Sequence, residues 1–414
     1  MESLFYDWFN LLLRMLHAIA AIAWIGASFY FVWLNNHLEV PDDKGKTRGL
    51  AGELWAVHGG GIYQVGKYRL APPVMPERLH WFKWEAYTTW VSGALLLTLV
   101  YYGRADLYLW QVGKWPATPT VAVIASLLYL AAGLLCYELL FRFLHPRSQQ
   151  LFNGLLVLMV AIACWLASRL FSDRAAFLQL GALLATIMAG NVFFGIIPAQ
   201  KRFLRALDAG EEPAAAPMLA AKRRSLHNNY FTLPVVFCML SNHYPFLYGH
   251  RFNWLALIAC VALGAYVRHF FNLRHRGQLK FHILVVAAAG TLLLALGLAQ
   301  TQKNIAPTTQ DSSLPTARKS LGNPMSLVET HCQGCHSAVP TEPGFSAAPL
   351  GLRLDTPQQV LAARDRILPT LRNRYMPLGN IAGMSEEERM ALIAALETDE
   401  VMAVQKTAFP DSSP

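Results

Sequence analysis

LLLRMLHAIAAIAWIGASFYFVWL, residues 11–34, is apolar over almost its whole length and sets the class of this fold. A helix needs about 20 residues to cross the roughly 30 Å hydrocarbon core of a bilayer, and this stretch is long enough. Seven further stretches share its character, near residues 84–102, 118–141, 151–171, 177–198, 230–248, 253–271 and 281–300. The sequence therefore predicts an all-α protein whose first 300 residues form a polytopic, eight-helix transmembrane bundle.

Lysine and arginine are distributed unevenly between these predicted spans. They collect in the loops near residues 35–83, 142–150, 199–229 and 268–280, and cytoplasmic loops of membrane proteins are enriched in these two residue types. An even number of spans then places both termini on the outer, periplasmic side of a bacterial inner membrane. The net charge of +9 accordingly indicates orientation in the membrane, and we find no nucleic-acid-binding motif.

A second signature, CQGCH at residues 332–336, lies in the more polar remainder of the chain. Two cysteines at this spacing, followed at once by histidine, are typical of a covalently attached c-type haem. Cys332 and Cys335 are expected to form the thioether bonds and His336 to bind the iron. The preferred second axial ligand is Met376, whose loop Pro377 stiffens. The competing methionines are Met384, Met390 and Met402.

Residues 322–414 are therefore predicted to form a small class I cytochrome c domain and a tail. One helix should precede CQGCH, and a capping box at residues 385–388 should open a last helix. The haem would supply much of the core that so short a domain lacks. Residues 301–321, rich in Thr, Ser, Gln and Pro, are predicted to be a polar linker. Since haem c is attached outside the cytoplasm, this motif and the charge distribution predict the same orientation.

Two histidines stand inside predicted spans, where ionisable side chains are costly and point to function. His17 in the first span and His243 in the sixth are predicted to lie at a similar depth near the outer side. They are candidate axial ligands of a haem b in the bundle. A pair of hydrogen-bonded structural histidines is the alternative, and the sequence leaves both interpretations open.

A second group of polar residues is predicted at the cytoplasmic side. The long loop over residues 35–83 is rich in aromatic residues and contains Gly59-Gly60-Gly61, which lets a backbone approach a ligand closely. Positive and aromatic side chains there would suit a planar anion. The candidate catalytic and substrate-binding residues are His58, Lys67, His80, Lys83, Glu85, His227 and Asn228. Lys222, Arg223 and Arg224 are interpreted as charges that set the topology.

A family resemblance becomes specific at these residues. GELWAVHGGGIYQVGKY (52–68), LHWFKWEAYTTWVSG (79–93), HNNYFTLPVVFCMLSNHYPF (227–246) and CQGCH together resemble the PuuD-type membrane urate oxidases, which carry a cytochrome c tail. The resemblance implies oxidation of urate to 5-hydroxyisourate, with water as the oxygen source. It also implies that electrons leave through cytochrome c to a soluble cytochrome c or terminal oxidase, without formation of hydrogen peroxide. It does not identify the catalytic residues.

The expected mechanism combines an anion site with an electron path. Urate would bind at the cytoplasmic side, and His or Glu would remove a proton as two electrons depart. Because haem c lies beyond about 30 Å of hydrocarbon, a carrier at His17 and His243 is predicted, unless urate binds from the outer side. The alternatives are a quinol- or porphyrinogen-oxidising membrane cytochrome and, from another class, a transporter with a tethered cytochrome.

Overall fold

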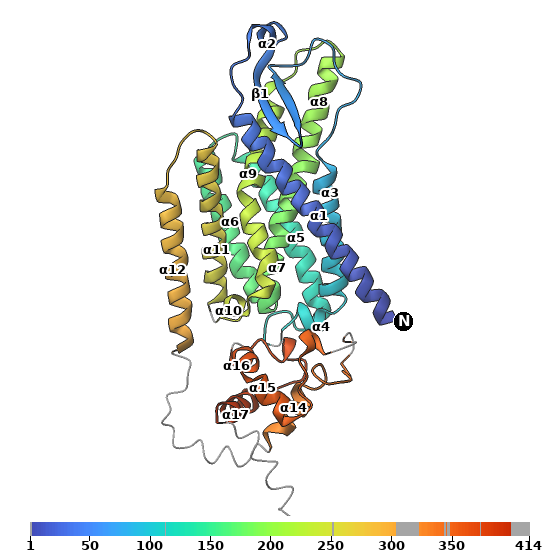
Figure 1. Ribbon diagram of the computed structural model, residues 1–414, viewed down its shortest axis with the longest axis vertical. Helices are drawn as coiled ribbons and strands as arrows, with labels where there is room; N and C mark the ends of the chain where they lie inside the picture. Colours follow the sequence, from blue (N-terminus) through green and yellow to red (C-terminus); the bar gives the residue numbers. More distant parts are fainter. Residues whose placement is uncertain are drawn as a thin grey trace, which may run out of the picture.

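The structure, a computed structural model, describes residues 2–303 except 112 and 251, and residues 323–398 except 343–344, 346–347 and 373 (Figure 1). This described part is mainly helical. Its first portion contains the long helices α1 (Glu2–Asn36), α3 (Trp84–Leu96), α5 (Pro119–Phe143), α6 (Gln149–Leu170), α7 (Asp173–Gly190), α8 (Ile197–Asp208), α9 (Ala215–Leu240), α11 (Asn253–Arg274) and α12 (His282–Lys303). Short helices are α2 (Asp43–Thr47), α4 (Ala105–Tyr108) and α10 (Pro245–Tyr248).

Irregular turns extend three of these helices. The π-helical turn η1 (Leu97–Tyr102) continues α3, and a second one, η2 (Asn191–Ile196), joins α7 to α8. The 3₁₀ turn η3 (Ser241–His243) follows α9. The two π-helical turns are wider than a regular helical turn, and turns of this kind often occur at functional sites.

Side-chain caps fix where several bundle helices begin. The hydroxyl of Thr118 accepts a hydrogen bond from the Val121 amide, with Pro119 at the first helical position of α5. Ser148 and Ser172 cap α6 and α7 in the same way. The polar backbone at these helix starts is thus satisfied locally, which allows the chain to reverse direction at the ends of the bundle.

In the described part of the chain, six helical segments are long and apolar enough to cross a membrane: Phe5–Asn36, Pro119–Phe143, Gln149–Leu170, Asp173–Asp208, Asn253–Arg274 and His282–Ala299. Helices α3 and α9 are present near the other two predicted spans but do not meet this criterion. The predicted limits of the sixth span are wrong, since α9 begins at Ala215 and ends at Leu240. The His227-Asn228-Asn229-Tyr230 run therefore lies inside a helix and not at its start.

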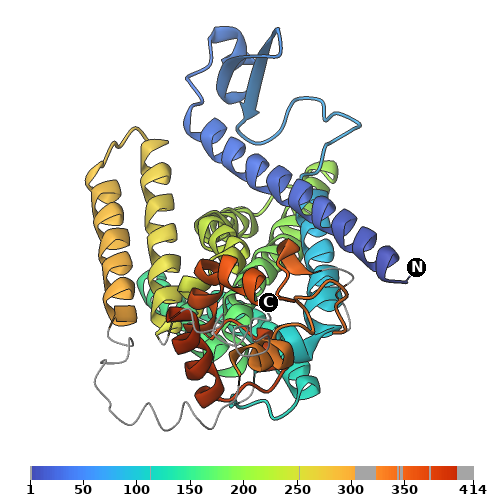
Figure 2. The same ribbon diagram turned by 60° about the horizontal axis from the view of Figure 1, so that its bottom comes forward.

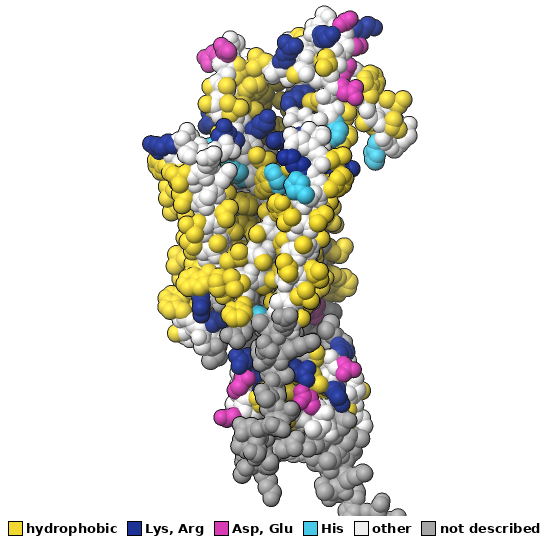
Figure 3. Space-filling view, turned by 90° about the vertical axis from the view of Figure 1, so that its left-hand side faces the viewer, with side chains coloured by type: hydrophobic (Ala, Val, Ile, Leu, Met, Phe, Trp, Pro, Cys, Tyr) yellow, Lys and Arg dark blue, Asp and Glu magenta, His cyan; other side chains and the backbone are white. Residues whose placement is uncertain are grey.

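The outer surface of the bundle is largely apolar. Figure 3 shows hydrophobic side chains covering the middle of the visible face, with lysines and arginines gathered above them. Leu293 on α12 and Val157 on α6 are about two-thirds exposed, at 68% and 70%. An apolar band bordered by basic side chains is the arrangement expected of a protein surrounded by lipid.

The loop between α1 and α3 contains a β-hairpin, which the all-α prediction missed. Strands β1 (Leu50–His58) and β2 (Gly61–Tyr68) pair antiparallel, with Val57 opposite Ile62. Gly59 and Gly60 form the turn at φ values of 56° and 81°, where glycine avoids the strain of a side chain. Gly59 and Gly60 thus close a hairpin, and Gly61 begins β2.

Residues 323–398 form a smaller helical unit with its own apolar core. Its elements are α14 (Pro324–His331), η4 (Pro349–Gly351), α15 (Pro357–Ala362), α16 (Arg364–Arg372), η5 (Leu378–Asn380) and α17 (Glu386–Glu397). The predicted capping box is confirmed, because the Ser385 hydroxyl accepts from the Glu388 amide and the Glu388 carboxylate accepts from the Ser385 amide. Figures 1 and 2 show the unit against the end of the bundle that α4 and α10 form. Most of the predicted linker and the tail beyond residue 398 lie outside the described residues.

Candidate functional site

The two predicted haem b ligands lie at different depths. His17 Nδ1 is 3.0 Å from both the Thr89 carbonyl oxygen and the Ser92 hydroxyl of α3. His243 is exposed in η3, next to Asn242, whose side chain accepts a hydrogen bond from Tyr101. Ser92 and Tyr101 are nine residues apart along α3 and η1, which is roughly 13 Å at 1.5 Å per residue. The prediction of a shared level is wrong, and the pair does not fit a clamp around one haem.

The candidate residues of the hairpin lie away from the interior of the bundle. His58 is exposed at the end of β1, opposite Gly61. Lys67, on β2, is also exposed and donates a hydrogen bond to the Asn35 side chain near the end of α1. These contacts anchor the hairpin to α1 but do not bring the two candidates together.

The candidates at the start of α3 form a separate aromatic group. His80 is exposed and packs edge-on against Phe82, with ring centroids 4.7 Å apart. The Lys83 ammonium lies 5.4 Å from the ring centroids of both Trp81 and Trp84. Glu85 has one buried carboxylate oxygen without a hydrogen-bond partner among the described residues.

Helix α9 directs its predicted candidates into a buried polar network. His227 Nδ1 lies 2.8 Å from the Tyr137 hydroxyl, and its ring stacks on Phe152. Asn228 donates to the Met188 carbonyl oxygen and accepts from the Asn191 side chain of η2 at 2.8 Å. His227 and Asn228 are therefore the two predicted candidates that the structure places in one interior region.

Arg224 belongs to this network, which corrects its interpretation as a topology charge. Its side chain forms a two-point ion pair with Glu138 at 2.5 and 2.7 Å and also donates to Asn191. It also lies over the Phe141 ring, 4.1 Å from the centroid. Because the arginine has a carboxylate partner, this network holds α5, η2 and α9 together and does not call for an anionic ligand.

Gly195 of η2 gives a test of that structural role. A Cβ atom at this position would come within 2.3 Å of Arg224 Cδ, which the ion pair with Glu138 fixes. We expect Gly195→Ala to cost about 1–3 kcal/mol of stability, the range for overpacking, and to lower the thermal unfolding temperature in detergent. Gly154→Ala on α6 is the control, since nothing lies within 4 Å of its Cβ position. Equal unfolding temperatures for the two variants would contradict this role.

A different cluster, around Arg268 of α11, has the properties of a ligand site. Arg268 is only 3% exposed and donates through Nε to the Asn229 side chain at 2.9 Å. One of its terminal nitrogens, the Asn229 amide nitrogen and both amide atoms of Asn272 are buried without hydrogen-bond partners among the described residues. No carboxylate in the described part of the chain lies within ion-pair distance of Arg268. A buried cation without such a partner is costly, so the arrangement suits an anion.

The Arg268 cluster adjoins a cavity between α1, α9 and α11. This cavity has a volume of about 370 Å³ and is lined by Phe29, Tyr30, Trp33, Leu233, Arg268, Phe271 and His275. The Arg268 guanidinium lies 3.7 Å from the centroid of the Phe29 ring. Aromatic walls with a few polar donors are typical of sites for small planar ligands.

Two histidines stand at the end of this cavity. His275, which caps α11, packs edge-on against His37 at 5.9 Å, and His37 stacks on Trp33 at 5.1 Å. Burial lowers the pKa of His275, and the nearby charges of Arg268, His37 and Arg274 lower it further. His275 is therefore neutral at pH 7 and able to accept a proton.

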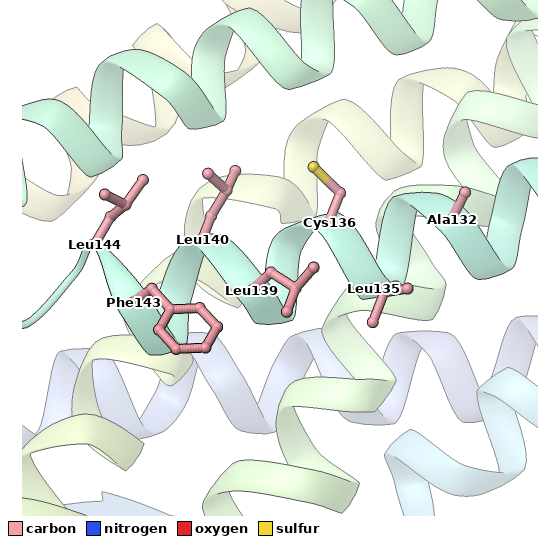
Figure 4. A pocket seen from close by; sticks show the side chains of 7 residues that line it. All are labelled: Ala132, Leu135, Cys136, Leu139, Leu140, Phe143 and Leu144. Atoms are coloured by element: carbon pink, nitrogen blue, oxygen red, sulfur yellow. The ribbon is translucent and has the colours of Figure 1, made fainter.

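A second pocket offers no polar side chain to a ligand. Figure 4 shows it on one face of α5, between Ala132 and Leu144, with side chains from that helix alone. Its lining is apolar, and Leu135, Cys136 and Leu139 are exposed. It is a shallow depression in the apolar outer surface.

The CQGCH segment forms a tight turn at the end of α14. Cys332 ends α14, and the Cys335 and His336 amides both donate back to the Cys332 carbonyl oxygen. His336 is 9% exposed, and its Nδ1 lies 3.0 Å from the Leu352 carbonyl oxygen. This contact orients the ring and leaves Nε2 available to bind a metal, as is usual for metal-binding histidines.

The methionines of this unit have different environments. Met384 is 3% exposed in the apolar core, and Met390 is 40% exposed on α17, while Met376 is half-buried. In the described residues no three His, Cys, Asp or Glu side chains are grouped as a bare metal ion would need. The donor set of Cys332, Cys335 and His336 with Met376 instead fits an iron held in a porphyrin.

Comparison with known proteins gives one match. Residues 3–299 match a family model described as urate oxidase N-terminal. No curated protein and no solved structure matches the chain.

Proposed function

The chain belongs to the urate oxidase N-terminal family, and from this premise we propose that it oxidises urate within the membrane and passes the electrons to a haem c on its C-terminal unit. The family supports an oxidoreductase that acts on urate. The observation that carries the proposal further is the buried Arg268 without a carboxylate partner. It offers a charge for an anionic substrate inside an apolar bundle.

Urate suits this cavity in planarity and charge. It is a planar anion with several carbonyl oxygens and ring N–H groups, so the guanidinium of Arg268, which lines the cavity, suits it as a partner. Asn229, bonded to Arg268, and Asn272, one helical turn along α11, add unpaired amide groups behind the cavity wall. The rings of Phe29 and Trp33 supply flat surfaces for stacking. Water would be excluded once the substrate fills the cavity, which strengthens these charged hydrogen bonds.

Oxidation of uric acid to 5-hydroxyisourate adds one water molecule and releases two electrons and two protons. A basic group near the substrate is therefore needed to receive a proton as the ring becomes electron-poor. His275 fits this role, since it lines the cavity and is neutral at pH 7. Arg268 keeps its charge throughout and holds the substrate anion in place.

The pH dependence of the reaction tests His275. The proton-accepting form is the neutral ring, and burial and nearby positive charges keep its pKa below the usual 6.5. We expect kcat/KM to be constant at neutral pH and to fall only as the pH drops through this lowered pKa. His275→Gln should lower the plateau and remove the acidic limb, whereas an unchanged limb in this variant would contradict the assignment.

The C-terminal unit provides the proposed exit for electrons. Cys332 and Cys335 would hold the porphyrin, and His336 and Met376 would bind the iron. A haem bound there accepts and releases one electron at a time. The Leu352 carbonyl orients the His336 ring, and the Arg389 side chain donates to the carbonyl oxygen of Met376, which positions its loop.

The proposed topology follows from this division of roles. All eight predicted helices cross the membrane. Helix α3 packs on α1 and α7 with one face and exposes Trp90 and Val91 on another, whereas α9 packs between α7 and α11. The C-terminal unit then lies in the periplasm, and the Arg268 cavity lies toward the cytoplasmic end. Because electrons cannot cross the distance between the two in one step, the proposal requires a carrier inside the bundle, and His17 and His243 cannot hold it together as a pair.

Stoichiometry in membranes tests the proposed function as a whole. Under argon, the protein should consume urate in the presence of a soluble one-electron acceptor and reduce two acceptor molecules per urate. No hydrogen peroxide should form. Consumption that depends on oxygen and produces peroxide would contradict the proposal.

A further inference from the structure

The C-terminal unit contacts the bundle through both segments proposed to bind haem c. Glu342 accepts a hydrogen bond from Arg104, at the start of α4, at 3.3 Å. Its own backbone amide donates to the carbonyl oxygen of Gly334, inside CQGCH. On the other side, Tyr375 packs against Tyr248 of α10 with ring centroids 5.6 Å apart. Tyr375 directly precedes Met376, and Gly334 directly precedes Cys335. Both contacts with the bundle are therefore adjacent to residues proposed to bind the haem.

The bundle presents a preformed surface to these two segments. Tyr248 is 1% exposed and Tyr101 is 5% exposed. Asn242 accepts hydrogen bonds from both the Tyr101 hydroxyl, at 3.2 Å, and the Arg174 side chain, at 3.3 Å. Tyr375 packs on the apolar core of the bundle although it belongs to the C-terminal unit. These buried aromatic side chains favour one docked orientation of the C-terminal unit.

The ion pair at this surface is weak. The Arg104 and Glu342 side chains are about one-quarter exposed, at 24% and 25%, and a partly exposed ion pair contributes only about 1 kcal/mol or less. Domain contacts of this modest kind are compatible with separation of the two parts. The surface therefore positions the unit without fixing it permanently.

We propose that this docked arrangement is the electron-receiving position, and that the C-terminal unit must leave it to reduce an external acceptor. The inference rests on the proposed function, because it requires haem c. In the docked position a haem c held by Cys332, Cys335 and His336 would be reduced by one electron that originates from urate. The segments that carry CQGCH and Met376 are the ones that contact Arg104 and Tyr248, so a second protein would compete with the bundle for them. After undocking, these segments are free to face a soluble one-electron carrier protein, which would be reduced by the same electron.

A reversible cross-link tests the proposal in the holoenzyme. The variant Arg104→Cys with Glu342→Cys, in a Cys136→Ser background, is joined by a bis-maleimide that contains a cleavable disulfide. Each single-cysteine variant, treated in the same way, is the control. Two rates are measured by stopped flow: urate-driven haem reduction, and oxidation of chemically reduced haem by a soluble c-type cytochrome.

We expect the cross-link to leave urate-driven reduction within about twofold and to slow delivery to the soluble cytochrome at least tenfold, with recovery after cleavage. Equal delivery rates with and without the cross-link would overturn the proposal. Loss of urate-driven reduction in the cross-linked form alone would also overturn it. The delivery rate does not depend on urate, so a failure of urate oxidation in every form would refute the proposed function separately.

A charge exchange supplies an independent test of the same surface. Arg104→Glu should slow urate-driven haem reduction severalfold, because the two carboxylates would then repel. Adding Glu342→Arg should restore the rate. Equal rates for all three proteins would show that this contact does not position the haem.

Discussion

Replacing Arg268 by glutamine is expected to abolish urate-dependent reduction of the haem while leaving its attachment intact. Removing one partner of a buried charged pair costs about 2–5 kcal/mol, which corresponds to a loss in kcat/KM of roughly 30-fold to several thousand-fold. The loss should be large here because Arg268 is 3% exposed and water cannot replace it. The measurement is the initial rate of haem reduction over a range of urate concentrations.

The control for this variant is Arg274→Gln on the same helix. Arg274 is exposed in the last turn of α11, so its loss should change kcat/KM by less than about threefold. Arg268→Lys should recover part of the affinity, since it keeps the charge but not the planar pair of donors. Similar activities for Arg268→Gln and Arg274→Gln would show that the Arg268 cavity is not the substrate site.

Replacing Cys332 and Cys335 together by alanine is expected to give a protein that binds urate but does not oxidise it. Without the two thioether bonds the haem is no longer held covalently, and urate has no exit for its electrons. Turnover should fall to the background of the assay. Urate binding, measured by equilibrium dialysis, should remain, because the Arg268 cavity lies in the bundle and not in the C-terminal unit.

Cys136→Ser is the matched control for this double variant. Cys136 is an exposed residue of α5, away from CQGCH, and its loss should affect neither haem content nor turnover. Retained urate oxidation in the double alanine variant, with no haem bound, would show that electrons leave by another route.

The helical body was largely predictable because length and apolarity are local properties of the sequence. Helices occur near all eight predicted stretches. The limits of α9 were not predictable, since its first turns carry Lys222, Arg223 and Arg224 and resemble a cytoplasmic loop. The hairpin was missed although its signal is visible: Val57 and Ile62 flank a glycine turn between stretches rich in β-formers.

The substrate cavity was harder to predict because it depends on how helices face one another. Arg268 was interpreted as part of a basic cytoplasmic loop, whereas it lies inside α11. One signal for this site was present in the sequence. Arg268, Asn272 and His275 are separated by four and three residues, a spacing that places them on one face of a helix. Asn229 is adjacent to the predicted Asn228 but faces the opposite partner helix, a difference that only packing reveals.

Anaerobic mixing of urate with the oxidised holoprotein, followed by the absorption bands of the haem, tests the central claim most directly. We predict that urate reduces the haem c in the absence of oxygen, and that one urate molecule reduces the haems of two protein molecules. The Arg268→Gln variant should not show this reduction. A wild-type protein that contains haem c, binds urate and yet leaves the haem oxidised would contradict it.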